Sequence, residues 1–150
     1  MRQLAYAALF LIFALALAGC SGDGGAEHTW DGPPDPGFGG SVEVEGFVEH
    51  AESVDETWEG SPVMAATKFL RLDERSATRT SVVATTTAEG AGPHAVIVTL
   101  DGLLDDSVRT ERWTLLFEPD GDTFTLTTAQ WSQRCQPGRG HQGYAAGACV

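Results

Sequence analysis

Two different spacings of apolar side chains divide this 150-residue chain, one typical of helices and one typical of strands. Between residues 44 and 58 the apolar positions recur at intervals of three and four, which is the period of one helix face. They are Val44, Phe47, Val48, Ala51, Val54 and Trp58. The opposite face is acidic, and like charges four residues apart, together with Gly46, weaken such a helix by itself. We therefore expect this helix to form because its apolar face packs on the rest of the domain.

A second helix is expected over about residues 62–73. Ser61 is a favourable N-cap because its hydroxyl can accept a hydrogen bond from a free amide of the first turn. Pro62 follows at the first helical position, where its fixed φ suits a helix and no N–H is needed. The apolar stripe behind these signals consists of Val63, Ala66, Phe69 and Leu70.

Beyond the second helix the period of the apolar positions falls from about 3.6 to 2, the period of a strand. Four strands are expected, at 78–87, 94–100, 108–117 and 123–134. The Gly/Pro-rich segment 89–93 and the sequence Pro-Asp-Gly-Asp at 119–122 predict turns between them. In the last strand the apolar residues Leu126 and Ala129 have opposite parity, which predicts a β-bulge near Thr127–Thr128.

Two helices followed by four strands predict an α+β domain, with the two N-terminal helices packed on a four-stranded antiparallel meander. This order of elements resembles the cystatin-like and NTF2-like architectures, in which a sheet wraps a helix. The resemblance is one of topology, since no sequence motif of either family is present. A shared topology does not by itself imply a function.

The N-terminus carries the pattern of an export signal. Arg2 precedes an uncharged apolar run, Leu4–Ala18, which has the length of a signal h-region and is too short to span a bilayer. The run ends in Leu17–Cys20, Leu-Ala-Gly-Cys, which resembles the lipobox of bacterial lipoproteins. That resemblance implies cleavage of residues 1–19 and lipidation of Cys20. An ordinary secretory signal with a coincidental cysteine, or an uncleaved signal anchor, are the alternatives.

Residues 20–40 are rich in glycine and proline and read as a flexible tether. Such a segment cannot bury enough apolar surface to offset the entropy of ordering it. Trp30 and Phe38 are the exceptions, and either could dock on the domain. Residues 41–150 are then expected to form a single domain, since about 110 residues is an ordinary size for one core.

The chain is strongly acidic, with 9 Lys and Arg against 21 Asp and Glu and a formal net charge of −12. Removal of the signal peptide, which contains Arg2, would make the net charge −13. Nucleic acids are therefore not expected as partners, because they attract clustered basic residues. The partners that the sequence favours are the membrane, through lipid on Cys20, and another protein of the cell envelope.

The chain has three cysteines, an odd number for an exported protein. If Cys20 carries lipid, Cys135 and Cys149 remain as a pair, and we expect a disulfide between them. The segment between them contains Pro-Gly-Arg-Gly-His and resembles the C-terminal tails of uncharacterised small exported bacterial proteins. Within it, Arg139 and His141 flank Gly140 and are candidates for contact with a small anion or a partner. In the alternative interpretation, Arg139 pairs with a domain carboxylate such as Asp105 or Asp106.

No catalytic, metal-binding or cofactor-binding motif stands out, so we name no catalytic residues, no metal ligands and no cofactor. The four histidines are scattered along the chain at positions 28, 50, 94 and 141, without the short spacings of a zinc site. The sequence favours a lipid-anchored protein of the bacterial cell membrane or outer membrane, with its domain outside the cytoplasm and a non-enzymatic binding or structural role. The alternative is a small enzyme or ligand carrier with a pocket on the concave face of the sheet, lined by His94, Trp113 or Arg112.

Overall fold

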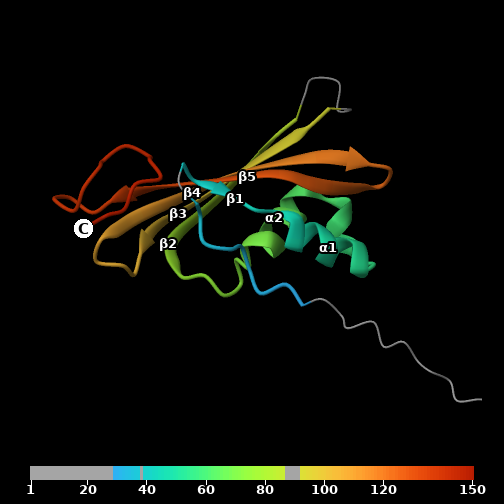
Figure 1. The fold of residues 1–150 in the computed structure, drawn as a ribbon, viewed down its shortest axis with the longest axis horizontal. Helices are drawn as coiled ribbons and strands as arrows, with labels where there is room; N and C mark the ends of the chain where they lie inside the picture. Colours follow the sequence, from blue (N-terminus) through green and yellow to red (C-terminus); the bar gives the residue numbers. More distant parts are fainter. Residues whose placement is uncertain (1–28, 38, 87–91) are drawn as a thin grey trace, which may run out of the picture.

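A computed structural model describes residues 29–37, 39–86 and 92–150. The expected signal peptide, Cys20, Phe38 and most of the expected turn at 89–93 lie outside the described residues. The elements are β1 (Ser41–Val42), α1 (Glu45–Ser53), the 3₁₀ helix η1 (Thr57–Gly60), α2 (Pro62–Leu70), β2 (Ala77–Thr85), β3 (His94–Leu103), β4 (Val108–Asp120) and β5 (Thr123–Cys135). The strands form one antiparallel sheet in the order β1-β5-β4-β3-β2, and both α-helices lie against the same face of it (Figure 1). Within the described ranges, no helix has the length and apolar character needed to cross a bilayer.

The α+β class is confirmed, but the expectation of four strands is corrected to five. The additional strand is β1, which pairs Ser41 with Gln130 and Val42 with Ala129 at the outer side of β5. A strand of two residues is too short to show a period of two, so its sequence carries no strand signal. Its pairing depends on the neighbouring Gly40, whose carbonyl accepts a hydrogen bond from the Trp131 amide at 2.7 Å.

The first helix is shorter than expected, because α1 ends at Ser53 and Val54 takes an extended conformation. The chain then turns through η1, which is closed by reciprocal hydrogen bonds between Glu56 and Glu59. This turn brings Trp58 into the core, where it is 7% exposed. Trp58 therefore packs with the helical layer as expected, although it does not continue the same helix.

The second helix begins as expected, with Pro62 at its first turn and the Ser61 hydroxyl accepting from the Met64 amide at 3.4 Å. It ends at Leu70 rather than near residue 73, because Arg71 adopts the left-handed conformation (φ 47°, ψ 53°). Such a helix end is usually made by glycine. Because arginine is not typical of a helix end, the sequence did not predict that α2 stops here.

The core lies between α2 and the helix-facing side of the sheet. Phe69 of α2 packs edge-on against Trp113 of β4, with ring centroids 6.3 Å apart. The fully buried side chains around this contact come from β3, β4 and α2: Val96, Val98, Leu100, Leu115, Phe117, Ala66 and Leu70. The β-bulge is confirmed, since Leu116 pairs with Thr128 while Phe117 pairs with Leu126. The bulge returns Leu126 and Ala129 to the same face of the sheet.

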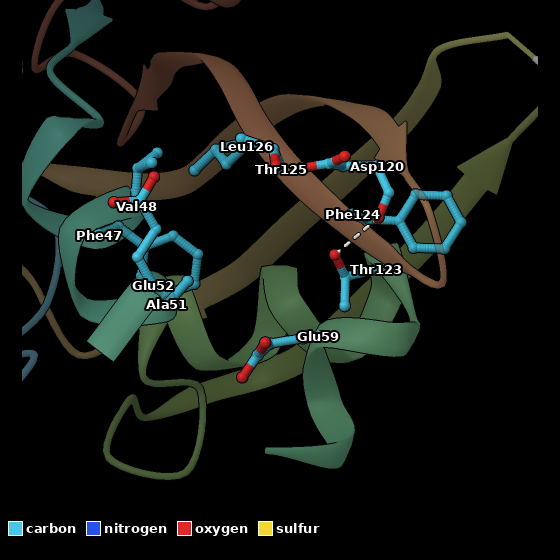
Figure 2. A pocket seen from close by; sticks show the side chains of 10 residues that line it. All are labelled: Phe47, Val48, Ala51, Glu52, Glu59, Asp120, Thr123, Phe124, Thr125 and Leu126. Atoms are coloured by element: carbon cyan, nitrogen blue, oxygen red, sulfur yellow. Dashed lines mark hydrogen bonds between the residues drawn. The ribbon is translucent and has the colours of Figure 1, made fainter. Parts of the chain in front are cut away.

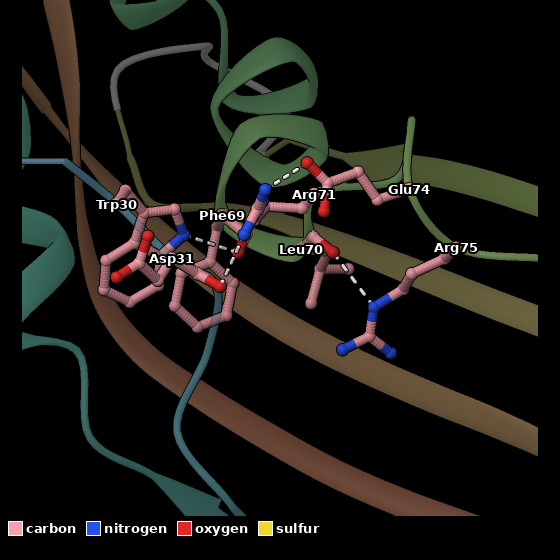
Figure 3. A network of polar contacts seen from close by, with 7 residues as sticks. All are labelled: Trp30, Asp31, Phe69, Leu70, Arg71, Glu74 and Arg75. Carbon is pink, nitrogen blue, oxygen red and sulfur yellow. Dashed lines mark hydrogen bonds and ion pairs between the residues drawn. The ribbon is translucent and has the colours of Figure 1, made fainter.

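The described part of the expected tether lies against the domain, and Trp30 makes the contact. Its indole N–H donates to the Phe69 carbonyl at 2.8 Å, and its ring stacks on the Phe69 ring with centroids 5.5 Å apart. Arg71 donates to the Asp31 carbonyl at 2.9 Å and pairs with Glu74 (Figure 3). The packed part of the chain therefore includes Trp30, ahead of the expected domain boundary at residue 41.

Candidate functional site

The C-terminal loop is closed by the expected disulfide between Cys135 and Cys149, whose Cα atoms are 5.4 Å apart. Within the loop, both ring nitrogens of His141 lie 2.9 Å from backbone carbonyls, those of Gly143 and Gly147. These two hydrogen bonds, the one to Gly147 first, raise the pKa of His141 above its ordinary value of 6.5. The imidazole is thus engaged by the loop's own backbone.

Arg139, the other candidate in this loop, extends towards Asp106, and Nη2 lies 3.8 Å from Oδ2. Arg139 thus pairs with a domain carboxylate, as in the alternative interpretation of this residue. Asp105 instead caps the β3–β4 turn by accepting hydrogen bonds from the amides of Val108 and Ser107 and from the Ser107 hydroxyl, which lower its pKa. The structure therefore does not bring Arg139 and His141 together around one ligand position.

One group of potential metal ligands occurs among the described residues, comprising Cys135, His141 and Cys149 with ligand atoms within 4.8 Å of one another. Both sulfur atoms belong to the disulfide. Metal binding by cysteine requires the thiolate. In the oxidised protein this group therefore offers no set of metal ligands.

The helix-covered face of the sheet is filled by side chains where a pocket was considered. Trp113 is 2% exposed, and the Arg75 guanidinium lies over its ring at 5.2 Å. His94 packs edge-on against Phe124 with ring centroids 4.8 Å apart. Because successive side chains of a strand point to opposite faces, Arg112 lies on the face away from Trp113. Of the three residues expected to line one pocket, Arg112 is thus separated from the other two.

A small cleft opens between α1, η1 and the β4–β5 hairpin (Figure 2). Its volume is about 140 Å³. Phe47, Leu126 and Phe124 form apolar walls, while Glu52 and Asp120 bring carboxylates to its edge. This cleft is a minor feature, large enough for a few water molecules or a short apolar group.

The more distinctive feature is a groove of about 380 Å³ on the sheet face opposite the helices, which we call the arginine groove. It is lined by Arg79, Ser81, Thr99, Asp101, Thr110, Arg112, Arg134 and Tyr144. Strand register explains the grouping: Arg79 pairs with Asp101, Asp101 with Thr110, and Thr110 with Arg134. These four residues form a row across β2, β3, β4 and β5. In the next row, Thr99 pairs with Arg112.

Tyr144 of the C-terminal loop covers one end of the arginine groove. The Arg112 guanidinium lies 3.5 Å from the centroid of its ring, and that of Arg134 lies 5.1 Å away. The loop reaches this position because Ala145 pairs with Gln133 of β5 in an antiparallel bridge. The Nε of Arg112 is buried and has no hydrogen-bond partner within the described part of the chain.

The one carboxylate in the groove is ionised at neutral pH. Asp101 accepts a hydrogen bond from the Thr110 hydroxyl at 2.6 Å, and Arg109 approaches it at 4.0 Å. The hydrogen bond, and then the positive charges of Arg109, Arg134 and Arg79, lower the pKa of Asp101. Three arginines thus share the groove with one carboxylate that already has partners.

Sequence reasoning missed this groove, although Arg112 had been considered for a pocket. The sequence held only part of the information needed to find the groove. Alternation along each strand places its arginine on the outward face of the sheet. Which outward positions become neighbours depends on strand register, which the pattern along one strand does not determine.

No family model matches the chain, and no curated protein and no solved structure shows significant similarity to it.

Proposed function

We propose that the protein is a lipid-anchored protein of the bacterial cell envelope that binds a ligand or partner without catalysing a reaction. The observation that carries this proposal is the Cys135–Cys149 disulfide, which accounts for two of the three cysteines in the sequence and leaves Cys20 to be explained. Disulfides persist in oxidising compartments outside the cytoplasm. The remaining cysteine ends the lipobox-like sequence Leu17–Cys20, where lipid attachment would account for it.

The length of the connection supports a position close to the membrane. Trp30, which packs on the domain, follows Cys20 by ten residues. A fully extended chain of that length reaches at most about 35 Å. The acidic character of the chain opposes spreading onto an anionic lipid surface, so the domain would remain in the aqueous layer beside the membrane.

The binding role is supported by the uncovered face of the sheet. Within the described residues both α-helices lie on the other face (Figure 1). The arginine groove lies on the face that they leave uncovered. A ligand carrier of cystatin-like or NTF2-like topology is the finer version of this proposal, since the two helices precede the meander. Since the helix-covered face is filled by side chains, such a carrier would bind its ligand in the groove on the opposite face, where polar groups converge from four strands.

Metabolic labelling tests the anchor. The full chain, expressed in a bacterial host with labelled palmitate, is expected to incorporate label and to sediment with membranes. Cys20→Ser should abolish incorporation, whereas Cys149→Ser, which removes a cysteine of the disulfide, should still be labelled. Absence of label from the wild-type chain, or equal labelling of Cys20→Ser, would contradict the lipid anchor.

A further inference from the structure

The arginines of the described chain fall into two groups according to whether a carboxylate pairs with them. Arg71, Arg75, Arg109 and Arg139 each lie within 4.0 Å of a carboxylate oxygen. Among the described residues, the three arginines without such a pair are Arg79, Arg112 and Arg134, and all three line the arginine groove. The chain has 21 acidic residues and only 9 basic ones, so most arginines should find a carboxylate nearby. Composition therefore does not explain why three arginines without such a pair lie together.

We propose that the arginine groove binds an oxyanion, the phosphate or carboxylate group of a small ligand. The inference rests on the proposed binding role and is independent of the lipid anchor. Guanidinium groups present N–H donors in a planar fork that matches carboxylate and phosphate oxygens. Arg112 and Arg134 are the principal ligand-binding residues of this site, because Tyr144 contacts both.

Tyr144 orients the guanidinium of Arg112 before a ligand arrives. Stacking on the aromatic ring occupies the face of the guanidinium and leaves the N–H donors at its edge. A side chain held in this way loses less rotational freedom on binding. The ring also excludes water from one side of the groove, which strengthens the attraction between Arg112 and an anion.

The unsatisfied Nε of Arg112 is the second observation that indicates a ligand. A buried N–H without an acceptor is unfavourable because it has lost its hydration without gaining a hydrogen bond, and such groups are rare in folded proteins. Arg112 lines the groove, and its buried Nε has no hydrogen-bond acceptor among the described residues. A small rotation of the guanidinium would direct this N–H to an oxygen of a bound anion.

The remaining groups of the groove set the charge and size of the ligand. Asp101 is held by Thr110 and Arg109, so it does not neutralise the groove completely. The hydroxyl groups of Ser81 and Thr99 are further donors to oxygen. A volume of about 380 Å³ suits a compact molecule rather than a folded partner. A free cation would be repelled by the three arginines.

Titration of the full chain in an uncharged detergent at low salt tests the proposal, with amide NMR shifts as the readout. Inorganic phosphate and citrate serve as separate probes for the two oxyanions. Binding of either is expected to shift the amides of Thr99, Arg112 and Tyr144. Arg112→Gln and Arg134→Gln should each weaken binding about tenfold, while Arg139→Gln, which removes the same charge outside the groove, should leave it unchanged.

Two further variants keep the test decisive if Arg112→Gln disturbs the loop. Arg112→Lys retains the charge but lacks the planar fork, so intermediate binding is expected. Arg79→Gln changes an exposed side chain and should weaken binding without altering the fold. A response to phosphate alone indicates a phosphate group in the ligand, and a response to citrate alone indicates a carboxylate group. Either result supports an oxyanion site.

The proposal is overturned if neither probe shifts the groove amides at about 10 mM, a weak limit for a specific site. It is also overturned if Arg139→Gln weakens binding as much as Arg112→Gln. Neither result affects palmitate labelling at Cys20, and loss of labelling leaves the titration unchanged. Failure of the oxyanion site and failure of the lipid anchor are thus separate outcomes.

Discussion

The guanidinium of Arg112 lies 3.5 Å from the centroid of the Tyr144 ring, and this contact joins the C-terminal loop to the face of the sheet opposite the helices. The two residues are 32 positions apart in the sequence. Their contact requires both the disulfide-closed loop and its bridge to β5. The stability of this loop and the shape of the arginine groove are therefore coupled.

Tyr144→Ala should lower the free energy of unfolding by about 1 kcal/mol, because a partly exposed cation–π contact contributes about 0.5–2 kcal/mol. Urea unfolding followed by tryptophan fluorescence measures the change. Tyr144→Phe retains the ring and should unfold like the wild type. Equal loss in both variants would show that the hydroxyl, rather than the stacked ring, stabilises the loop.

Replacement of both Cys135 and Cys149 by serine should lower the free energy of unfolding by about 3 kcal/mol, since the disulfide closes a loop of about 15 residues. The sheet should persist, because β4 and β5 pair along their whole length. Circular dichroism and urea unfolding test both statements. Free thiols at these two positions in protein recovered from the envelope would contradict the disulfide.

The C-terminal loop should be most stable at mildly acidic pH because of His141. A neutral imidazole has one donor and one acceptor, whereas the charged ring can donate to the carbonyls of both Gly143 and Gly147. Since the folded-state pKa is raised above 6.5, this contribution is fully present below pH 6.5 and is lost as the pH rises through the folded-state pKa.

Proton NMR of the His141 ring should therefore give a higher pKa in the folded chain than in concentrated urea. His141→Gln should remove the corresponding part of the pH dependence of unfolding. A folded-state pKa at or below the urea value would contradict the paired hydrogen bonds.

Trp30→Ala should lower the free energy of unfolding by about 2 kcal/mol, less than the 3–5 kcal/mol typical of a fully buried aromatic side chain. Trp30 is only partly buried, against Phe69 and Phe47. Trp30→Phe keeps an aromatic ring but loses the hydrogen bond to the Phe69 carbonyl, so a smaller loss of about 1 kcal/mol is expected. Unchanged stability in Trp30→Ala would show that residues before 41 do not stabilise the domain.

The ion pair of Arg75 and Glu111, with a nitrogen–oxygen distance of 2.9 Å, should stabilise the fold beneath α2. Both side chains are less than one-third exposed, and Glu111 also accepts from the Trp113 indole at 3.3 Å. A double-mutant cycle with alanine should give a coupling of about 1–2 kcal/mol. The more exposed pair of Arg71 and Glu74 is the matched control and should couple by less than about 0.5 kcal/mol.

Local signals in the sequence predicted the beginning of α2 and the positions of the long strands. Ser61 and Pro62 act on the turn that immediately follows them, so their effect does not depend on distant residues. The bulge at Thr127 was visible because a change of parity is a property of one strand. The end of α1 was missed, because Trp58 is drawn into the core by a separate turn rather than by the helix itself.

The sequence by itself determined the alternation of faces along each strand, the capped start of α2 and the pairing of Cys135 with Cys149. Tertiary structure decided that Arg79, Arg112 and Arg134 lie in one groove and that Tyr144 covers it. The physical reason is that side-chain alternation assigns a residue to a face of the sheet, whereas its neighbours on that face depend on strand register. Register is set by the turns and by core packing, which act between segments far apart in the chain.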